Sequence, residues 1–353
     1  MSDIAIIKAQ ADFAIDLLNN VVYENNKPVE STILSPLSLS MALAMVYVGA
    51  DGETNKELGK LLSEGLKEEE THKYFGKLFN NYNDNKPKNY TLELANKVFV
   101  KEGFKILEEF KKFINENYGG KFELLDFSKS VEAAKIINDF VEQTTHDKIK
   151  NLISPDSLNQ DTRQVDMMKK TDYFVYFEDK ELQMLKMFYS GSSSEEEEDE
   201  DIYMVVFLPQ ERFGLQKMIK NLNGEKVLKL LESGRKTKVD VLFPKFKLES
   251  THNLNEVLIK LGLTTAFGNQ ANFSKISKEQ PLQIDKVVQK AFIEVNEEGT
   301  EAAAATAVIL ETRSMVINVE SIQFKADHPF YYAIMKNNEK NGHEFSFAGV
   351  FYG

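Results

Sequence analysis

The 353-residue sequence contains no cysteine, so disulfide bonds, thiol catalysis and cysteine-ligated metal sites are all excluded. It also lacks a basic surplus, because the net charge is −12 and the run Glu195–Asp201 supplies seven of the negative charges. Nucleic acid and anionic membranes require a basic patch, so neither is expected as a partner. Hydrophobic residues at 42% and charged residues at 28% are typical of a soluble globular protein.

The N-terminus does not have the composition of a signal peptide. Lys8 and Asp12 interrupt its apolar residues, so no cleaved leader is expected. Ser31–Ala50 is uncharged and nearly of membrane length, but Pro36 indicates a loop followed by a buried helix. These features leave two locations open: the cytoplasm, or the extracellular space reached by a leaderless route.

Motifs for enzymatic chemistry are absent from the sequence. It has no phosphate-binding glycine loop, no GxSxG and no HExxH. No two of the five histidines have metal-ligand spacing within one element, and His328, between Asp327 and Pro329, is expected to be structural. We therefore expect no enzyme activity, no cofactor and no metal.

Hydrophobic periodicity predicts helices in the first half of the chain and strands in the second. Because there is no regular βαβ alternation, we expect an α+β fold with a large, mainly antiparallel sheet. We expect a single domain, residues 1–353. Predicted helices lie at about 4–18, 37–49, 55–62, 69–79, 107–118, 133–141 and 254–262. Predicted strands lie at about 92–100, 173–177, 202–208, 238–248, 287–296, 308–319, 324–335 and 344–351.

One low-complexity stretch, SGSSSEEEEDED at residues 190–201, separates two predicted strands. Its like charges repel one another and it has no apolar residues to bury. We interpret it as a solvated acidic loop, in preference to a cation site or a docking segment.

Residues 294–314, EVNEEGTEAAAATAVILETRS, have an unusual pattern. Alone, Glu301–Thr306 would be predicted as a helix, since alanine is the best helix former. The residues on both sides are typical of strands, and Gly299 permits a turn before the alanines. As a strand, the segment would present Thr300, Ala302, Ala304 and Thr306 on one face. None of these is large or charged, so this face could be buried in a sheet.

EEGTEAAAATA resembles the hinge of the bait loop in serpins, a family of protease inhibitors. Three further stretches are similar to the same family: FKADHPFYYAI to its C-terminal signature, LSPLSLSMALAMVYVGADGET to its second helix, and LFPKFKL with LNEVLIKLGLTTAF to its later core. The resemblance covers nearly the whole chain, and it is strongest to leaderless, intracellular-type members. It implies the serpin fold, with a large central sheet, further sheets and about eight or nine helices.

The resemblance also implies a function, that of a single-use inhibitor and not an enzyme. In inhibitory serpins a protease cuts an exposed loop, which then inserts into the main sheet and traps the acyl-enzyme. Seventeen residues counted from Glu297 reach Arg313, which gives a bait loop at about 297–318 and a scissile bond between Arg313 and Ser314. An arginine at this position suits trypsin-like serine proteases, and we prefer this interpretation to that of a solvated loop cation. The hinge would consist of Glu297, Glu298, Gly299, Thr300, Glu301, Ala302, Ala303, Ala304, Ala305 and Thr306.

Several positions depart from the family pattern. After Arg163 a central strand and hairpin of about 30 residues have no counterpart, and that strand borders the place where the loop inserts. Ser35 and Ser38 match the polar cluster that controls sheet opening, but Gln289 replaces its usual histidine. Ser31 and Phe140 replace an asparagine and a tryptophan.

The departure after Arg163 supports an alternative function, a non-inhibitory or inactive serpin-fold binding protein. In that case the segment Thr300–Leu310 could fill the vacancy from within the chain. We expect the protein to be a monomer.

Overall fold

The computed structural model describes residues 2–23, 30–84, 97–119, 122–145, 166–189, 201–279, 281–296, 321–338 and 342–352. Within these ranges the chain forms nine α-helices and twelve strands. The helices are α1 (Ser2–Val22), α2 (Pro36–Gly49), α3 (Gly52–Ser63), α4 (Glu68–Asp84), α5 (Glu108–Tyr118), α6 (Ser130–Thr144), α7 (Leu215–Lys220), α8 (Gly224–Ser233) and α9 (Asn255–Lys260). A short 3-10 helix, Thr265–Phe267, follows α9.

Eight of the twelve strands form one sheet, in the order β1-β12-β11-β6-β5-β4-β7-β10. Its pairs are antiparallel except β7 with β10, so the predicted large, mainly antiparallel sheet is confirmed. Its strands are β1 (Thr32–Leu34), β4 (Met167–Glu178), β5 (Leu182–Phe188), β6 (Asp201–Pro209), β7 (Arg235–Pro244), β10 (Ile322–Lys325), β11 (Phe330–Asn338) and β12 (Gly342–Phe351). The other four strands form two separate pairs, β2 (Val98–Lys101) with β3 (Phe122–Leu125), and β8 (Phe246–Asn253) with β9 (Val288–Val295).

The middle of the eight-stranded sheet, at β6 and β11, is buried on both faces. Along β6, Tyr203, Val205 and Phe207 pack into a core shared with the helices. The alternate residues of the same strand pack into a second core with β7, β8 and β10. Side chains alternate along a strand, so a strand buried on both faces needs the nearly continuous apolar sequence that β6 has.

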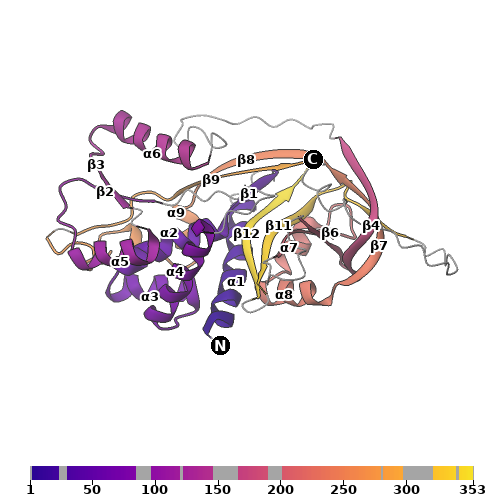
Figure 1. The fold of residues 1–353 in the computed structure, drawn as a ribbon, viewed down its shortest axis with the longest axis horizontal. Helices are drawn as coiled ribbons and strands as arrows, with labels where there is room; N and C mark the ends of the chain where they lie inside the picture. The colour runs from indigo at the N-terminus through magenta and orange to yellow at the C-terminus, as the bar shows by residue number, and fades with distance from the viewer. Residues whose placement is uncertain are drawn as a thin grey trace.

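The helices divide between the two ends of the molecule. Helices α2 to α5 gather at one end, and α7 and α8 lie at the other end with the large sheet, as Figure 1 shows. Helix α2 begins at Pro36, and the Ser35 Oγ accepts a hydrogen bond from the Ser38 backbone N–H at 3.3 Å. Most of its residues are buried, which explains its uncharged sequence. No helix among the described residues is long and apolar enough to cross a membrane.

Two predicted strands are each divided in the structure. The stretch 238–248 is the end of β7 and the start of β8, which separate at Lys245 and enter different sheets. The stretch 324–335 contains β10 and β11, separated by Ala326–Pro329. In both places a proline stands at the break, where it cannot donate to a ladder. The predicted strand at 308–319 and most of the acidic loop 190–201 lie outside the described residues, although Asp201 begins β6.

Candidate functional site

Two strands of different sheets hold the predicted bait loop. Strand β9 ends at Val295, just before the hinge, and β10 begins at Ile322, just after the loop. Strand β9 pairs with β8 in a small sheet, whereas β10 pairs with β7 in the large one. The loop therefore connects two separate sheets. The hinge Glu297–Thr306 and the bond Arg313–Ser314 lie outside the described residues and stay predictions.

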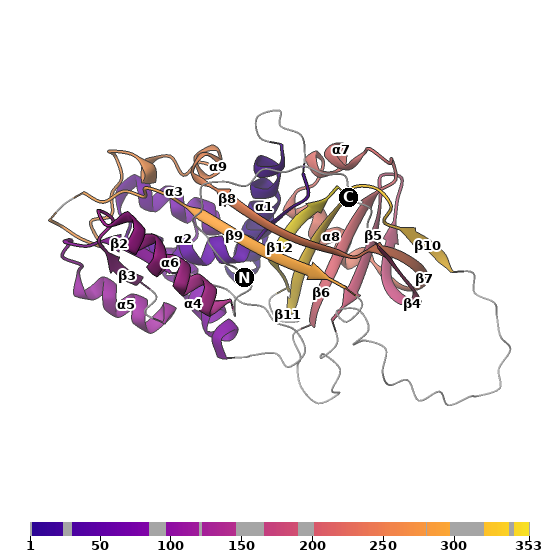
Figure 2. The same ribbon diagram turned by 90° about the horizontal axis from the view of Figure 1, so that it is seen from above.

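The two small sheets are not joined by any described strand. Strands β2 and β3 pair in parallel through four residues each, and β8 and β9 pair antiparallel through eight. In Figure 2, β8 lies on one side of β9, and α6 with β2 and β3 lies on the other. In the part of the chain that the structure describes, β9 thus has a ladder partner on one edge and none on the edge toward β2.

The predicted polar cluster comes together next to β9. The Ser35 N–H donates to Gln289 Oε1 at 3.0 Å, and Gln289 Nε2 donates to the Ser35 carbonyl at 2.7 Å. The Ser35 hydroxyl donates to the Ser346 carbonyl of β12 at 2.8 Å. Ser35 and Gln289 are both buried, at 4% and 8% exposure. Gln289 of β9 therefore connects the small sheet to Ser35, the residue before α2. Ser35 in turn connects the start of α2 to β12 of the large sheet. Ser38 joins this group through its backbone N–H.

A second group of polar residues, which was not predicted from the sequence, lies beside this cluster. Thr32 Oγ1 lies 3.0 Å from His252 Nε2 and donates to Ser250 Oγ at 3.2 Å. His252 stands directly opposite Gln289 in the β8–β9 ladder. Burial lowers the pKa of His252 to about 4, so its imidazole is neutral at physiological pH. The alternation of β8 could have indicated this group, because Ser250 and His252 share a face with Leu248.

Helix α6 is fastened to β2 by a basic and aromatic contact. Lys97 Nζ lies 4.7 Å from the ring centroid of Phe140 and 5.6 Å from that of Phe99, and it pairs with Glu123 at 2.6 Å. A cation over an aromatic face contributes about 0.5–2 kcal/mol. Phe140, which departs from the family pattern, thus still anchors α6. Ser31, the other such residue, accepts a hydrogen bond from the Tyr352 N–H at 2.8 Å.

Comparison with known proteins identifies the family. The family model described as Serpin (serine protease inhibitor) matches residues 8–165 and 159–350. The chain belongs to the serpin family.

The alignments with similar serpins cover nearly the whole length of both chains. The leukocyte elastase inhibitor of Bos taurus is 34% identical, with 94% of this chain and 96% of that protein covered. The antitrypsin of Bombyx mori is 31% identical, with 92% and 89% covered. Among solved structures, Serpin48 of Tenebrio molitor is 30% identical with a TM-score of 0.78, and 98% of this chain and 97% of that chain are covered.

The family match is divided at the predicted gap. Its two parts overlap at residues 159–165, around Arg163, after which the sequence predicts that a strand and hairpin are missing. The alignment with the bovine inhibitor extends over 379 residues, more than the 353 of this serpin. That relative therefore contains residues without a counterpart here. The separation of β2–β3 from β8–β9 agrees with a gap at this place.

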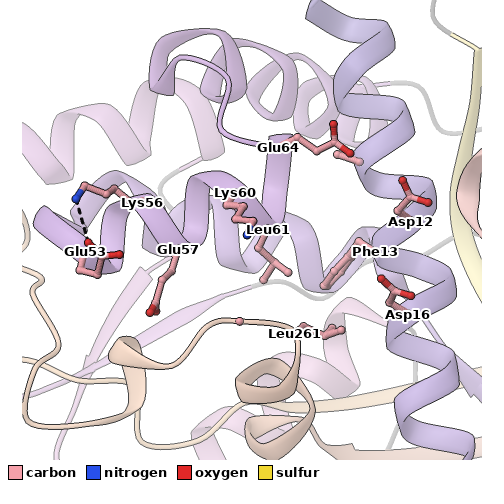
Figure 3. Close-up of a pocket in the computed structure, with 12 residues that line it drawn as sticks. Asp12, Phe13, Asp16, Glu53, Lys56, Glu57, Lys60, Leu61, Glu64 and Leu261 are labelled. Carbon is pink, nitrogen blue, oxygen red and sulfur yellow. Dashed lines mark hydrogen bonds and ion pairs between the residues drawn. The ribbon is translucent and has the colours of Figure 1, made fainter.

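A cavity of about 360 Å³ opens between α1, α3 and the residues after α9, far from β10. Figure 3 shows Asp12, Asp16 and Glu64 around it, with Phe13, Leu61 and Leu261 also lining it. Burial, together with the charge of Asp12, raises the pKa of Asp16. Lys56, which also lines the cavity, is paired with Glu53 at 3.0 Å. The lining groups do not place a nucleophile next to a base, which is the arrangement that nucleophilic catalysis requires.

His328 has the structural role that the sequence predicted. Its Nε2 lies 2.8 Å from the Pro209 carbonyl of β6, and its Nδ1 lies 2.9 Å from Asp327 Oδ1. It thereby holds the turn between β10 and β11 against the large sheet.

Proposed function

We propose that this serpin is a single-use inhibitor of trypsin-like serine proteases, which cut the Arg313–Ser314 bond. The proposal rests on the hinge sequence that directly follows β9, in a chain whose family is that of serine protease inhibitors. Fourteen residues from Thr300 to Arg313 would extend about 46 Å as a strand. Their insertion beside β9 would carry an attached protease across the molecule.

The chemistry of the hinge supports insertion. The edge of β9 toward β2 has no described ladder partner, so it offers backbone groups to an incoming strand. Backbone hydrogen bonds of about 1 kcal/mol each scarcely offset the backbone entropy lost on ordering, about 1–2 kcal/mol per residue. The remaining driving force must come from burial of the hinge face. A face of Thr300, Ala302, Ala304 and Thr306 can be buried without unpaired charge.

The primary specificity follows from Arg313. A guanidinium pairs with a carboxylate through two parallel hydrogen bonds, which is the arrangement an acidic primary pocket offers. The partner is therefore a trypsin-like protease.

The test is incubation with trypsin, followed by denaturing electrophoresis for a covalent complex. We expect a complex, and we expect N-terminal sequencing of the released fragment to begin at Ser314. Arg313→Ala should remove this reaction.

Thr300→Arg should convert trapping into simple cleavage, because it places a charge on the inserting face at a cost of several kcal/mol. A fragment that begins at any other residue contradicts the assigned bond, and an unchanged yield from Thr300→Arg contradicts the role of the hinge.

One observation favours a second function, that of a non-inhibitory or inactive serpin-fold binding protein. A strand missing after Arg163 would remove one of the two neighbours between which the loop inserts, and among the described residues β9 has no ladder partner on its edge toward β2. In this case the protein would be cleaved by trypsin as an ordinary substrate, and no covalent complex would form. The same gel distinguishes the two functions.

A further inference from the structure

The outward face of β4, β7 and β10 is unusually basic for this chain. On these strands Phe174, Val239 and Phe324 point into the second core, so the alternate residues point outward. The outward residues include four lysines and a tyrosine: Lys169, Tyr173, Lys236, Lys238 and Lys325. We call these five residues the basic sheet face. Figures 1 and 2 place its strands at the end of the molecule opposite α5.

Among the described residues, one carboxylate beside the basic sheet face, that of Asp240 on β7, offsets part of its charge. Asp240 accepts hydrogen bonds from Thr171 at 2.8 Å and Gln323 at 3.1 Å, and it lies 3.6 Å from Lys169 Nζ. No ion pair within the described chain involves Lys236, Lys238 or Lys325. Among the described residues, three ammonium groups without an ion pair thus share one surface of a protein whose net charge is −12.

The composition of the face suits a protein partner better than a polyanionic chain. Tyr173 is 56% exposed at its centre, directly opposite Lys238 in the β4–β7 ladder. Met167, 37% exposed, lies at one end of the face on β4. Tyrosine and methionine are enriched where proteins meet, whereas a polyanion site needs only positive charge. Lysine supplies compact charges that attract carboxylates over a distance.

The chain places this face close to the predicted scissile bond. Ser314 precedes Ile322, the first residue of β10, by eight residues. Eight residues reach at most about 29 Å when fully extended. A protease of about 220 residues has a radius of gyration of about 17 Å. A protease bound at Arg313 is therefore tethered within reach of β10 and of the face beside it.

We propose that the basic sheet face is a secondary docking surface for an acidic surface of the attacking protease. This inference rests on the proposed function, because the bait loop brings the protease to this end of the molecule. The face speeds association with acidic proteases by electrostatic steering and disfavours basic ones, while Arg313 sets the primary specificity.

The test compares an anionic and a cationic trypsin, which share the acidic primary pocket and differ in net charge. The face variant is Lys236→Glu/Lys238→Glu. The matched control is Lys73→Glu/Lys77→Glu on α4, where both lysines are exposed and the change in net charge is the same. At low salt we expect the face variant to react about 10-fold more slowly than the native protein with anionic trypsin, and the control to stay within about 2-fold. The 10-fold loss should shrink at high salt.

A binding measurement separates this inference from the proposed function. Arg313→Ala chains, with and without the face substitutions, are titrated with anionic trypsin whose catalytic serine is replaced by alanine. We expect salt-dependent binding that the face substitutions abolish and the α4 substitutions leave intact. If the native chain is not cut or trapped at Arg313, the proposed function fails, and this binding still decides the role of the face. Equal effects of the face and control variants overturn the inference, as does binding of a sulfated polysaccharide without any preference between the two trypsins.

Discussion

The large sheet and the β8–β9 pair differ in how many neighbours hold each strand. Strand β11 lies between β6 and β12, and its Phe330, Tyr331 and Tyr332 are fully buried. Strand β9 has β8 alone as a described ladder partner, and its Phe292 and Ile293 are only half-buried. Both strands come from apolar segments of similar length. The difference shows that an apolar strand sequence does not by itself determine how deeply the strand is buried. Its burial also depends on the neighbouring strands, which come from elsewhere in the chain.

Restoring the missing segment should have the largest effect on this difference. A strand and hairpin of about 30 residues inserted after Arg163 would give β9 and β2 a common neighbour. We expect a higher midpoint of thermal unfolding and a higher yield of covalent trypsin complex, because the loop would then insert between two strands. Both forms are compared at equal active concentration. Equally rapid trapping by the 353-residue form would show that the gap has no functional consequence.

Removing a ring from each sheet compares their packing directly. The Phe330 ring lies 5.2 Å from the Phe243 and Phe351 ring centroids. Phe330→Ala should lower the free energy of unfolding by about 3–5 kcal/mol through the cavity it leaves. Phe292→Ala on half-buried β9 should cost about 1 kcal/mol. Urea denaturation measures both losses, and equal values would mean that β9 is packed as firmly as β11.

Buried histidines report on each sheet separately. His252 lies on β8 and His343 on β12, and burial lowers the pKa of each to about 4. Because the unfolded chain binds their protons near pH 6.5, each should reduce stability as the pH falls from 6.5 toward 4 and have no further effect below that.

The native protein should therefore lose stability between pH 7 and pH 5 partly through these histidines. Replacement of either one by glutamine should make that loss in the free energy of unfolding smaller by up to about 2 kcal/mol. NMR titration of the imidazoles measures the two pKa values. A pKa near 6.5 for His252 beside a low value for His343 would show that the small sheet opens in solution.

The smallest effect concerns the link between the two sheets. Gln289→Ala leaves the N–H and carbonyl of Ser35 without their partner in a buried site, which should cost about 2 kcal/mol. Gln210→Ala is the control, since Gln210 is exposed and bonds to Glu178. It should change the free energy of unfolding by less than about 0.5 kcal/mol. A loss for Gln289→Ala as small as that of the control would mean that Ser35 finds other partners.

The sequence predicted those parts of the fold whose own residues determine them. Helix α2 followed from Pro36 and its uncharged run, and β6 from its continuous apolar residues. Strand β5 was missed because its LQMLKMF sequence has no clear period, and its place depends on pairing with β4 and β6. Helix α8 was also missed, although Val227, Leu230 and Leu231 have helical spacing.

At the candidate site, resemblance identified Ser35, Ser38 and Gln289, but their hydrogen bonds could not be read from residues so far apart in the sequence. The contact of His252 was not predicted, because its partner Thr32 is 220 residues away in the sequence. Tertiary pairing of this kind leaves no local periodicity.

The pairing of β1 with β12 sets a condition on biosynthesis. Thr32 lies opposite Val350, so one of the first strands to be translated waits for nearly the last residues before it finds its partner. At about 5–20 residues per second, the intervening 317 residues take roughly 15–60 s to be translated. Throughout that time β1 and the buried face of α1 lack their contacts with β12. A nascent chain that stalls near residue 340 lacks β12 and cannot form the β1–β12 pair. Until β12 has been translated, β1 therefore remains available for binding by chaperones.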